Sequence, residues 1–411
     1  MGCEPELGFS LGNYAAGERF WDRQREVAEI SAYLRDGQSL LITGPRRVGK
    51  TSLVRAVLAG LTEARTAFVD VEDLQSPAAF VASLGAEASR DAGTLERVRR
   101  WFGTRLGALA ERTQGVEVGL LKVELQAAVA GSWRTDAVEI VRAVAGDGPR
   151  AVVAVDELPL LVNRLLERDR EEAEALLSTM RSLAQQFPAV VWVVSGSIGL
   201  EPVLHRAGLT GMVTHLRAYP VEPWDPPTTA GAARALARTK ALALEPGAAD
   251  AVVEALGLGV PYHVQLLVDE LARDAARRGA SAVTAADVRR VYAGPFLSSA
   301  VRASMLHLES RLLTVLGEGD LLRLARDLLT QAAVASPLTA AAATALAADL
   351  VRDQAARPAA LREALEVLEH DAYLVRRGGG WQFASRLVRD WWRQGNELGF
   401  VRAEERGLAD G

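Results

Sequence analysis

A short segment rich in glycine and positive charge carries the most specific chemistry in this sequence. It reads Gly44-Pro45-Arg46-Arg47-Val48-Gly49-Lys50-Thr51, followed by Ser52, and fits the pattern GxxxxGK followed by Thr or Ser. Glycines let backbone N–H groups turn inward around phosphates, and a helix N-terminus adds partial positive charge. The segment therefore predicts ATP bound with Mg²⁺. Lys50 would reach the β- and γ-phosphates, and the Thr51 hydroxyl would hold the metal.

A pair of acids follows an unbroken apolar run later in the chain. Asp156 ends the run of residues 151–156, and Glu157 comes directly after it. We expect Asp156 to bind Mg²⁺ through water and Glu157 to polarise the water that attacks the γ-phosphate. The alternative is an ordinary acidic pair at a helix N-terminus, where acids are favoured.

Small polar residues follow the next apolar run, in Ser195-Gly196-Ser197. A hydroxyl at this place can contact the γ-phosphate or the attacking water. Ser197 is the preferred residue and Ser195 is its rival, so the predicted catalytic residues are Lys50, Glu157 and Ser197. A tight turn that merely needs small residues is the alternative.

Five apolar runs separated by helical stretches would position these side chains. The runs cover residues 39–43, 66–71, 151–156, 189–194 and, more weakly, 213–219. Continuous apolar strands alternating with helices predict an α/β fold with a parallel sheet buried on both faces. The first helix is predicted over residues 22–35, ending at Gly37. Alternation in residues 116–119 and 122–125 predicts a small hairpin.

The second half of the chain is mostly helical by pattern. Residues 220–227 contain four prolines, which excludes a helix interior and marks a boundary. Helices are then predicted from Thr229 to Tyr292, and a further boundary at Gly294-Pro295. The last segment has helices, a strand–turn–strand over residues 372–384 and a final helix, which is the pattern of a winged helix. We therefore predict a P-loop core over 1–220, a helical lid over 221–298 and a winged helix over 299–411.

Composition favours a protein of the reducing cytoplasm. The chain has 411 residues, a formal net charge of -5 and a single cysteine, so it can form no intramolecular disulfide. Its start lacks a basic and then apolar leader, so no signal peptide is expected. Residues 328–348 are uncharged, but they are rich in Ala, Ser and Thr and contain Pro337. They predict two short buried helices, and no membrane contact is expected.

Four strings resemble one protein family over most of the chain. They are Phe20-Trp21-Asp22-Arg23-Gln24-Arg25-Glu26, the segment from Gly44 to Leu53, Val155-Asp156-Glu157-Leu158-Pro159, and Gly259-Val260-Pro261-Tyr262. The chain resembles the additional-strand P-loop ATPases, and more narrowly the archaeal-type ATPases near the STAND branch of the AAA+ group. In this group the strand that ends in the acidic pair is not adjacent to the P-loop strand.

The resemblance also implies roles for residues outside the phosphate segment. Phe20 and Arg23 would lie beside the base or ribose, and Pro261 would pack on adenine, with Gly259 allowing a close approach. The simpler interpretation of Pro261 is a proline at the first position of a helix. Many lids of the AAA+ group present an arginine to the γ-phosphate, but the matching place here holds Tyr262 and His263.

Four arginines have open roles. Arg46 and Arg47 are not required by the phosphate pattern, and they would contact phosphate, face a neighbouring subunit or remain solvated loop charges. Arg181 and Arg217 are candidates for an arginine finger by position only.

The predicted function is a nucleotide-dependent regulatory switch that hydrolyses ATP and acts through an unknown protein partner. A homo-oligomer and a scaffold without turnover stay open. The alternative is a DNA-binding ATPase that resembles origin-recognition proteins. Charge argues against it, because residues 321–411 contain 12 Arg, no Lys and 12 Asp plus Glu, whereas DNA readers present a basic stripe. Arg376 and Arg377 are the best DNA-facing pair.

Overall fold

The computed structural model describes residues 7–11, 14–103, 118–129 and 131–406. The chain forms two compact units. The α/β unit comprises Arg23–Thr43 and Lys50–Val221. The helical unit comprises the residues up to Asp22, the short segment Gly44–Gly49 and the chain from Glu222 onward.

The α/β unit is built on a five-stranded parallel sheet in the order β2-β3-β4-β1-β5. Strand β4 lies between β1 and β3, so the predicted additional strand between the P-loop strand and the acidic strand is confirmed. Every residue of β3 and β4 is buried, as their continuous apolar runs predicted. The strands are β1 (Leu40–Thr43), β2 (Arg65–Asp70), β3 (Ala151–Asp156), β4 (Val190–Ser195) and β5 (Arg217–Pro220).

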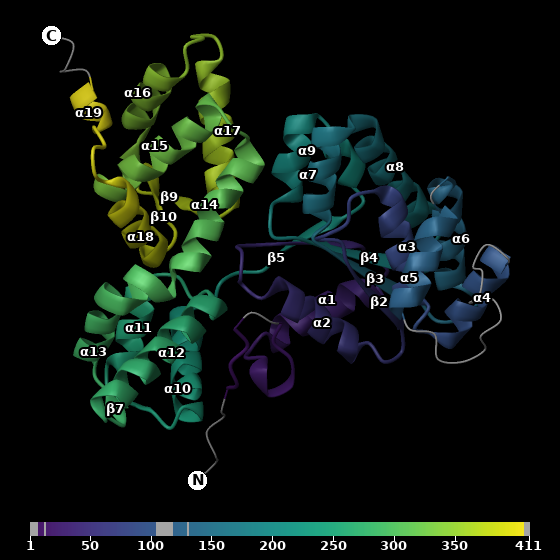
Figure 1. The fold of residues 1–411 in the computed structure, drawn as a ribbon, viewed down its shortest axis with the longest axis horizontal. Coiled ribbons are helices and arrows are strands. Elements are labelled where there is room, and N and C mark those ends of the chain that lie inside the picture. Colours follow the sequence, from purple (N-terminus) through teal and green to yellow (C-terminus); the bar gives the residue numbers. More distant parts are fainter. Residues whose placement is uncertain (1–6, 12–13, 104–117, 130, 407–411) are drawn as a thin grey trace. The chain divides into compact units, whose positions relative to one another are not determined.

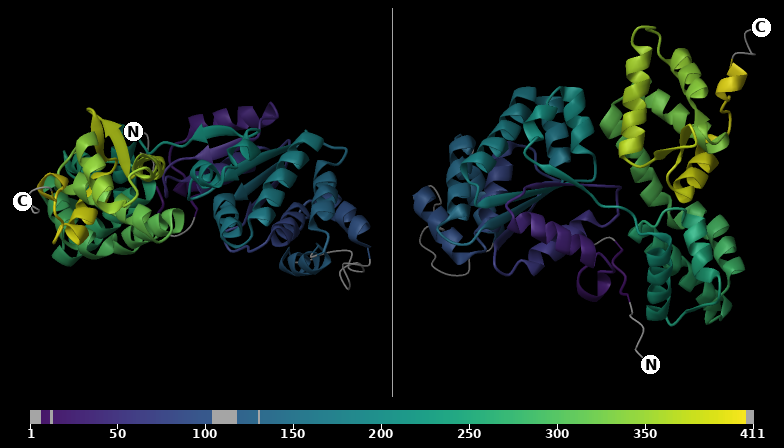
Figure 2. Two further views of the ribbon diagram at one scale, coloured as in Figure 1. Left: turned by 90° about the horizontal axis from the view of Figure 1, so that it is seen from above. Right: turned by 180° about the vertical axis from the view of Figure 1, so that it is seen from behind.

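Helices cover both faces of this sheet, as Figure 1 shows and the edge-on view in Figure 2 repeats. Helix α2 begins at Lys50, directly after the phosphate loop, and α7 begins one residue after Glu157. The helices of the unit are α1 (Gln24–Arg35), α2 (Lys50–Gly60), α3 (Pro77–Ala88), α4 (Ala92–Phe102), α5 (Val118–Val129), α6 (Trp133–Ala145), α7 (Leu158–Arg168), α8 (Arg170–Gln186) and α9 (Leu200–Ala207).

Two local predictions differ from the structure. Helix α1 begins at Gln24 because Asp22 and Arg23 have positive φ angles of 55° and 81°, which are not helical. The predicted hairpin is wrong where it can be checked: residues 118–119 and 122–125 lie in helix α5, while residues 116 and 117 fall outside the described part. Leu121, Leu125 and Val129 are buried at a spacing of four, so helical packing on α3 overrides the apparent alternation.

The helical unit contains two groups of elements in sequence order. The first is α10 (Pro226–Thr239), α11 (Ala248–Leu256), α12 (Pro261–Arg278) and α13 (Ala285–Val291), with the two-residue strands β6 (Ala243–Leu244) and β7 (Ala282–Val283). The second is α14 (Arg302–Leu316), α15 (Asp320–Val334), α16 (Ala340–Leu350), α17 (Arg357–His370), α18 (Arg386–Asn396) and α19 (Ala403–Arg406). A π-helical segment, Tyr292–Ala300, joins the two groups, with a break in helical geometry at Gly294.

A small antiparallel sheet lies among the second group of helices, in the order β8-β10-β9. Its strands are β8 (Leu338–Thr339), β9 (Leu374–Arg377) and β10 (Gly380–Phe383). The predicted succession of helices and a glycine-tipped hairpin is present, with Gly378 and Gly379 at positive φ. The identity of this segment as a winged helix stays a prediction.

The uncharged stretch of residues 328–348 forms the end of α15, the short strand β8 and most of α16, so the two separate helices that were predicted are present. Within the described ranges, no helix is both long enough and apolar enough to cross a membrane.

Candidate functional site

The phosphate loop lies between β1, which ends at Thr43, and α2, which begins at Lys50. This is the strand–loop–helix context that the motif predicts. Gly44, Arg47 and Gly49 have φ angles of 131°, 62° and 99°. The two glycines adopt such values without steric cost, whereas Arg47 carries a Cβ and is strained there. The loop is therefore held in a turned conformation that the backbone of most residues avoids.

The two residues predicted to hold Mg²⁺ lie together. The Thr51 hydroxyl donates to Asp156 Oδ2 at 2.6 Å, and the Ser195 hydroxyl donates to Asp156 Oδ1 at 2.6 Å. Asp156 is 4% exposed, so these bonds satisfy a buried carboxylate. Hydroxyl and carboxylate oxygens are ligands that Mg²⁺ prefers, and it usually takes only one or two from the protein beside phosphates. The residues present fit this metal.

Glu157 has a left-handed backbone, with φ 63°, between β3 and α7. Its Oε2 atom accepts hydrogen bonds from the Ser197 backbone N–H at 2.9 Å and from the Ser197 hydroxyl at 2.6 Å. The residue between the two serines must be small, because a Cβ on Gly196 would lie 2.5 Å from Cδ of Pro159. The two rival serines thus bind different carboxylates, Ser195 to Asp156 and Ser197 to Glu157. A direct contact of either serine with phosphate stays a prediction.

The first turn of α12 contains the predicted lid residues. Pro261 occupies the first helical position after Val260. Gly259 is required by a close approach within the helical unit: a Cβ there would lie 2.3 Å from the Trp224 carbonyl oxygen and 2.2 Å from the Thr229 hydroxyl. Close packing explains Gly259, and the first helical position explains Pro261, without a contact with nucleotide. Contact of Gly259 and Pro261 with adenine stays a prediction.

The family of the chain follows from a comparison of its sequence with family models. The model described as Novel STAND NTPase 1 matches residues 11–288, more than half of the chain. The chain belongs to this family. The resemblance to STAND and AAA+ ATPases drawn from four strings is therefore confirmed.

Solved structures with the same fold include two archaeal proteins. The Walker-type ATPase PABY2304 of Pyrococcus abyssi is 19% identical with a TM-score of 0.62, and the match covers 92% of this chain and 98% of that one. The Aeropyrum pernix ORC2 protein, solved in ADPNP–ADP complexes, is 13% identical with a TM-score of 0.56 and coverage of 97% of each chain. At these identities the likeness shows the fold alone. A search of curated proteins finds no match.

In this STAND protein, Tyr262 and His263 are the residues predicted to stand in the place of a lid arginine. The Arg47 guanidinium lies 3.9 Å from the centre of the Tyr262 ring. His263 is 5% exposed, and neither ring nitrogen has a hydrogen-bond partner among the described residues. Burial, together with the charge of Arg47, lowers the pKa of His263 to about 3. A neutral imidazole at this place cannot replace the charge of an arginine.

Phe20 and Arg23 lie on either side of the boundary between the two units. Phe20 is half-buried after the 3₁₀ turn Gly17–Arg19. Arg23 is 6% exposed and donates to Glu26 Oε1 at 2.6 Å. Their contact with the base or ribose stays a prediction, as does the nucleotide contact of Pro45, Val48 and Ser52.

The side chains of the two candidate arginine fingers form hydrogen bonds with other residues of the α/β unit. Arg181 donates to the carbonyl oxygen of Gly211 at 2.9 Å. Arg217 donates to Gln38 at 3.0 Å and to the Tyr33 hydroxyl at 3.1 Å. These bonds give both side chains a structural use, and a finger role stays a prediction.

Sequence reasoning missed two residues of α14 that contact the phosphate loop. Arg47 donates to the Ser304 hydroxyl at 2.5 Å, and Arg46 bonds to Nδ1 of His307. The contacts join residues 257 and 261 positions apart, which no local pattern reveals. The only available sign was that the two arginines exceed what the phosphate motif needs.

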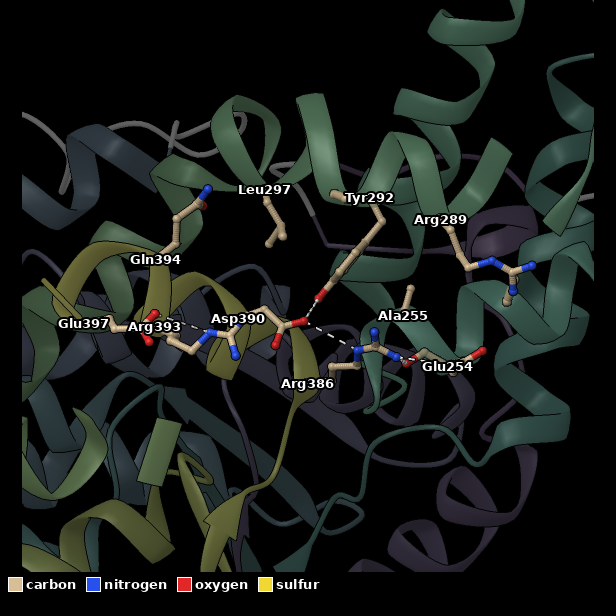
Figure 3. A pocket seen from close by; sticks show the side chains of 12 residues that line it. Glu254, Ala255, Arg289, Tyr292, Leu297, Arg386, Asp390, Arg393, Gln394 and Glu397 are labelled. Atoms are coloured by element: carbon tan, nitrogen blue, oxygen red, sulfur yellow. Dashed lines mark hydrogen bonds and ion pairs between the residues drawn. The ribbon is translucent and has the colours of Figure 1, made fainter. Parts of the chain in front are cut away.

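A hollow of about 490 Å³ lies between α11, the π-helical segment and α18. Its charged groups are largely paired with one another, as Figure 3 shows. Asp390 accepts from the Tyr292 hydroxyl at 3.1 Å and from Arg386 at 3.5 Å, and Arg386 also binds Glu254 at 3.3 Å. These hydrogen bonds and ion pairs connect the helices that line the hollow.

The buried His263 gives a testable dependence of stability on pH. Its folded pKa of about 3 lies below the ordinary 6.5, so the unfolded chain binds its proton first as the pH falls. Stability from the neutral ring is full above about pH 6.5 and is lost progressively towards pH 3. Between about pH 7.5 and 5.5, we expect the apparent Tm of His263→Leu to fall by less than the apparent Tm of the natural chain. Equal losses in thermal scans would contradict the burial of a neutral ring.

Proposed function

We propose that the chain binds ATP with Mg²⁺, hydrolyses its β–γ bond slowly and uses this cycle as a regulatory switch that acts through protein contacts. Membership of a STAND NTPase family supports the nucleotide class. The observation that carries the proposal is the paired network at the carboxyl edge of the sheet. Thr51 and Ser195 bind Asp156, while Ser197 binds Glu157. In this proposal, Asp156 beside Thr51 would hold the metal, and Glu157 would act on the attacking water.

Separate roles for Asp156 and Glu157 suit phosphoryl transfer, in which positioning and electrostatics supply most of the catalysis. Bound Mg²⁺ would neutralise charge on the β- and γ-phosphates, held by Thr51 and Asp156. Lys50, which is 7% exposed, would bind phosphate oxygens. Glu157 would accept the proton of the attacking water. Its left-handed backbone is a strain that proteins tend to keep at functional sites, and this supports a catalytic role.

The assignment of the phosphate loop to the helical unit supports the switch. Residues Gly44–Gly49 belong to the helical unit, although the strand before them and the helix after them belong to the α/β unit. A ligand shifts a conformational balance only through its differential affinity for the two states. The γ-phosphate supplies such a difference at the loop, and the helices in contact with the loop would respond to it.

A DNA-binding ATPase is the second candidate. Arg376 and Arg377 are exposed on the β9–β10 hairpin, which favours it. Acidic partners weigh against it elsewhere: Arg273, Arg277, Arg278 and Arg290 in and beside α12 all pair with Asp or Glu.

Salt dependence separates the two candidates. For the switch, we expect binding of a labelled DNA duplex to be weak and to change little between about 50 and 200 mM salt, since few phosphates would be neutralised. Fluorescence anisotropy measures it. A steep loss of tight binding, abolished by Arg376→Ala with Arg377→Ala, would favour the DNA candidate instead.

Turnover tests the roles of the two side chains at the carboxyl edge. We expect Glu157→Gln to keep ATP binding and to lower kcat by about 100-fold or more, as for loss of a general base. Ser197→Ala keeps its N–H but loses one bond to a charged group, so we expect a fall of about tenfold, mainly in kcat. Phosphate release measures both.

Two further variants serve as controls for turnover. Lys50→Ala should abolish ATP binding in isothermal titration. Ser182→Ala removes a half-buried α8 hydroxyl that, in the described part of the chain, accepts from Gln186, and it should leave turnover unchanged. If Glu157→Gln hydrolyses ATP at the natural rate, Glu157 is a helix-terminal acid and the base lies elsewhere.

Hydrogen exchange tests the switch. We expect amides of α12 and of α14 to α18 to exchange at different rates with ADP and with a non-hydrolysable ATP analogue. The γ-phosphate would change the loop that α12 and α14 contact, and α15 packs on α14 and on α16 to α18. Mass spectrometry of peptides from both states measures it. Identical protection in a chain that still turns over ATP would contradict a switch.

A further inference from the structure

Both arginines of the phosphate loop are bound by helices of the same unit. Arg47 donates to the Ser304 hydroxyl at 2.5 Å, and its guanidinium lies over the Tyr262 ring at 3.9 Å. Arg46 bonds to Nδ1 of His307. The loop is therefore in contact with the first turn of α12 and with α14, through side chains that the phosphate motif does not require.

The contacting face of α14 is firmly held. Ser304 and His307 are three residues apart, so they lie on one face of the helix. Ser304 is 3% exposed, and its neighbour Met305 is completely buried. The Tyr373 hydroxyl donates to the Leu308 carbonyl oxygen at 2.6 Å, and Glu309 pairs with Arg326 of α15 at 3.2 Å. Helix α14 thus links the loop arginines to the C-terminal elements of the chain.

The backbone of Arg47 explains why such support is needed. Its φ of 62° is unfavourable for a residue with a Cβ, and a strained residue persists only where its surroundings hold it. The hydrogen bond to Ser304 and the stacking on Tyr262 supply that support, since both are charge-assisted interactions in a half-buried place. Without them the loop would sample conformations in which its N–H groups no longer converge on phosphate.

We propose that Tyr262, Ser304 and His307 form a loop clamp, which holds the phosphate loop in its nucleotide-receiving conformation through Arg46 and Arg47. The C-terminal elements regulate nucleotide affinity through this clamp. The inference rests on the proposed function and adds the regulation of its site. A movement of α14 breaks the Ser304 and His307 bonds together, lowers the fraction of competent loop and weakens binding in proportion.

Linkage gives the clamp a second consequence. If the clamp raises nucleotide affinity, bound nucleotide must stabilise the clamp by the same factor. A displacement of α14 would therefore favour release of nucleotide, and bound nucleotide would oppose that displacement.

Affinity for a fluorescent ADP analogue in the full chain tests the clamp. We expect Ser304→Ala and His307→Ala each to raise Kd by about tenfold or more, as for loss of a bond to a charged group, mainly through faster release. Ser310→Ala is the matched control. Its hydroxyl lies on the same helix and, among the described residues, donates to the His307 carbonyl oxygen, so its Kd should not change. Thermal unfolding confirms that each variant folds.

Two more variants ask whether the effect passes through the loop. His307→Asn keeps an acceptor near the position of Nδ1 and should restore most of the lost affinity. In a cycle of Arg46→Ala and His307→Ala, the double variant should bind no more weakly than Arg46→Ala alone. Additive losses, or no rescue by His307→Asn, would overturn the clamp.

The outcomes separate this inference from the proposed function. If the natural chain fails to bind the ADP analogue, or if Lys50→Ala binds it equally well, the proposed nucleotide site is wrong. If the natural chain binds it and Lys50→Ala does not, while the Ser304 and His307 variants match the natural chain, the clamp alone is wrong.

Discussion

The buried carboxylate of Asp156 is the interaction on which the arrangement of the site depends. A carboxylate that is 4% exposed must be hydrogen-bonded, because its desolvation is otherwise too costly. Its two donors come from different elements, Thr51 in the first turn of α2 and Ser195 at the end of β4. Ser195 reaches it because β4 pairs directly with β3, while Thr51 comes from the helix that follows β1 on the other side of β4. The strand order thus brings together the hydrogen-bond donors that the buried carboxylate requires.

Backbone strain occurs at three of the predicted site residues. Among the described residues other than glycine, six have a positive φ, and they include Arg23, Arg47 and Glu157. Each of these three makes side-chain bonds that offset the strain: Arg23 with Glu26, Arg47 with Ser304 and Glu157 with Ser197. Strain held in place by specific partners is typical of functional sites.

Much of the α/β unit could be predicted from the sequence. Buried parallel strands are continuous apolar runs, so β3 was predicted with its observed bounds and the others within a few residues. The phosphate motif is local as well. The hairpin failed because a short stretch such as residues 122–125 satisfies both alternation and helical spacing, and only the packing of α5 on α3 decides.

The partners of the site residues could not be predicted, for a physical reason. Motifs report residues that act together along the chain, whereas Ser197 binds Glu157 from 40 positions away and Ser304 binds Arg47 from 257. Such contacts depend on the tertiary fold. The sequence showed Ser197 as a polar residue after a strand, but not that its hydroxyl would meet a carboxylate.

The proposed regulation of the phosphate loop follows from the path of the chain. Thr43 and Lys50 belong to the α/β unit, while the residues between them belong to the helical unit. A loop of this kind cannot change conformation without affecting both the helix that begins at Lys50 and the partners of Arg46 and Arg47. The two acids also have partners outside the loop and α2, because Ser195 binds Asp156 and Ser197 binds Glu157. The proposed clamp and the proposed catalytic acids therefore depend on different contacts.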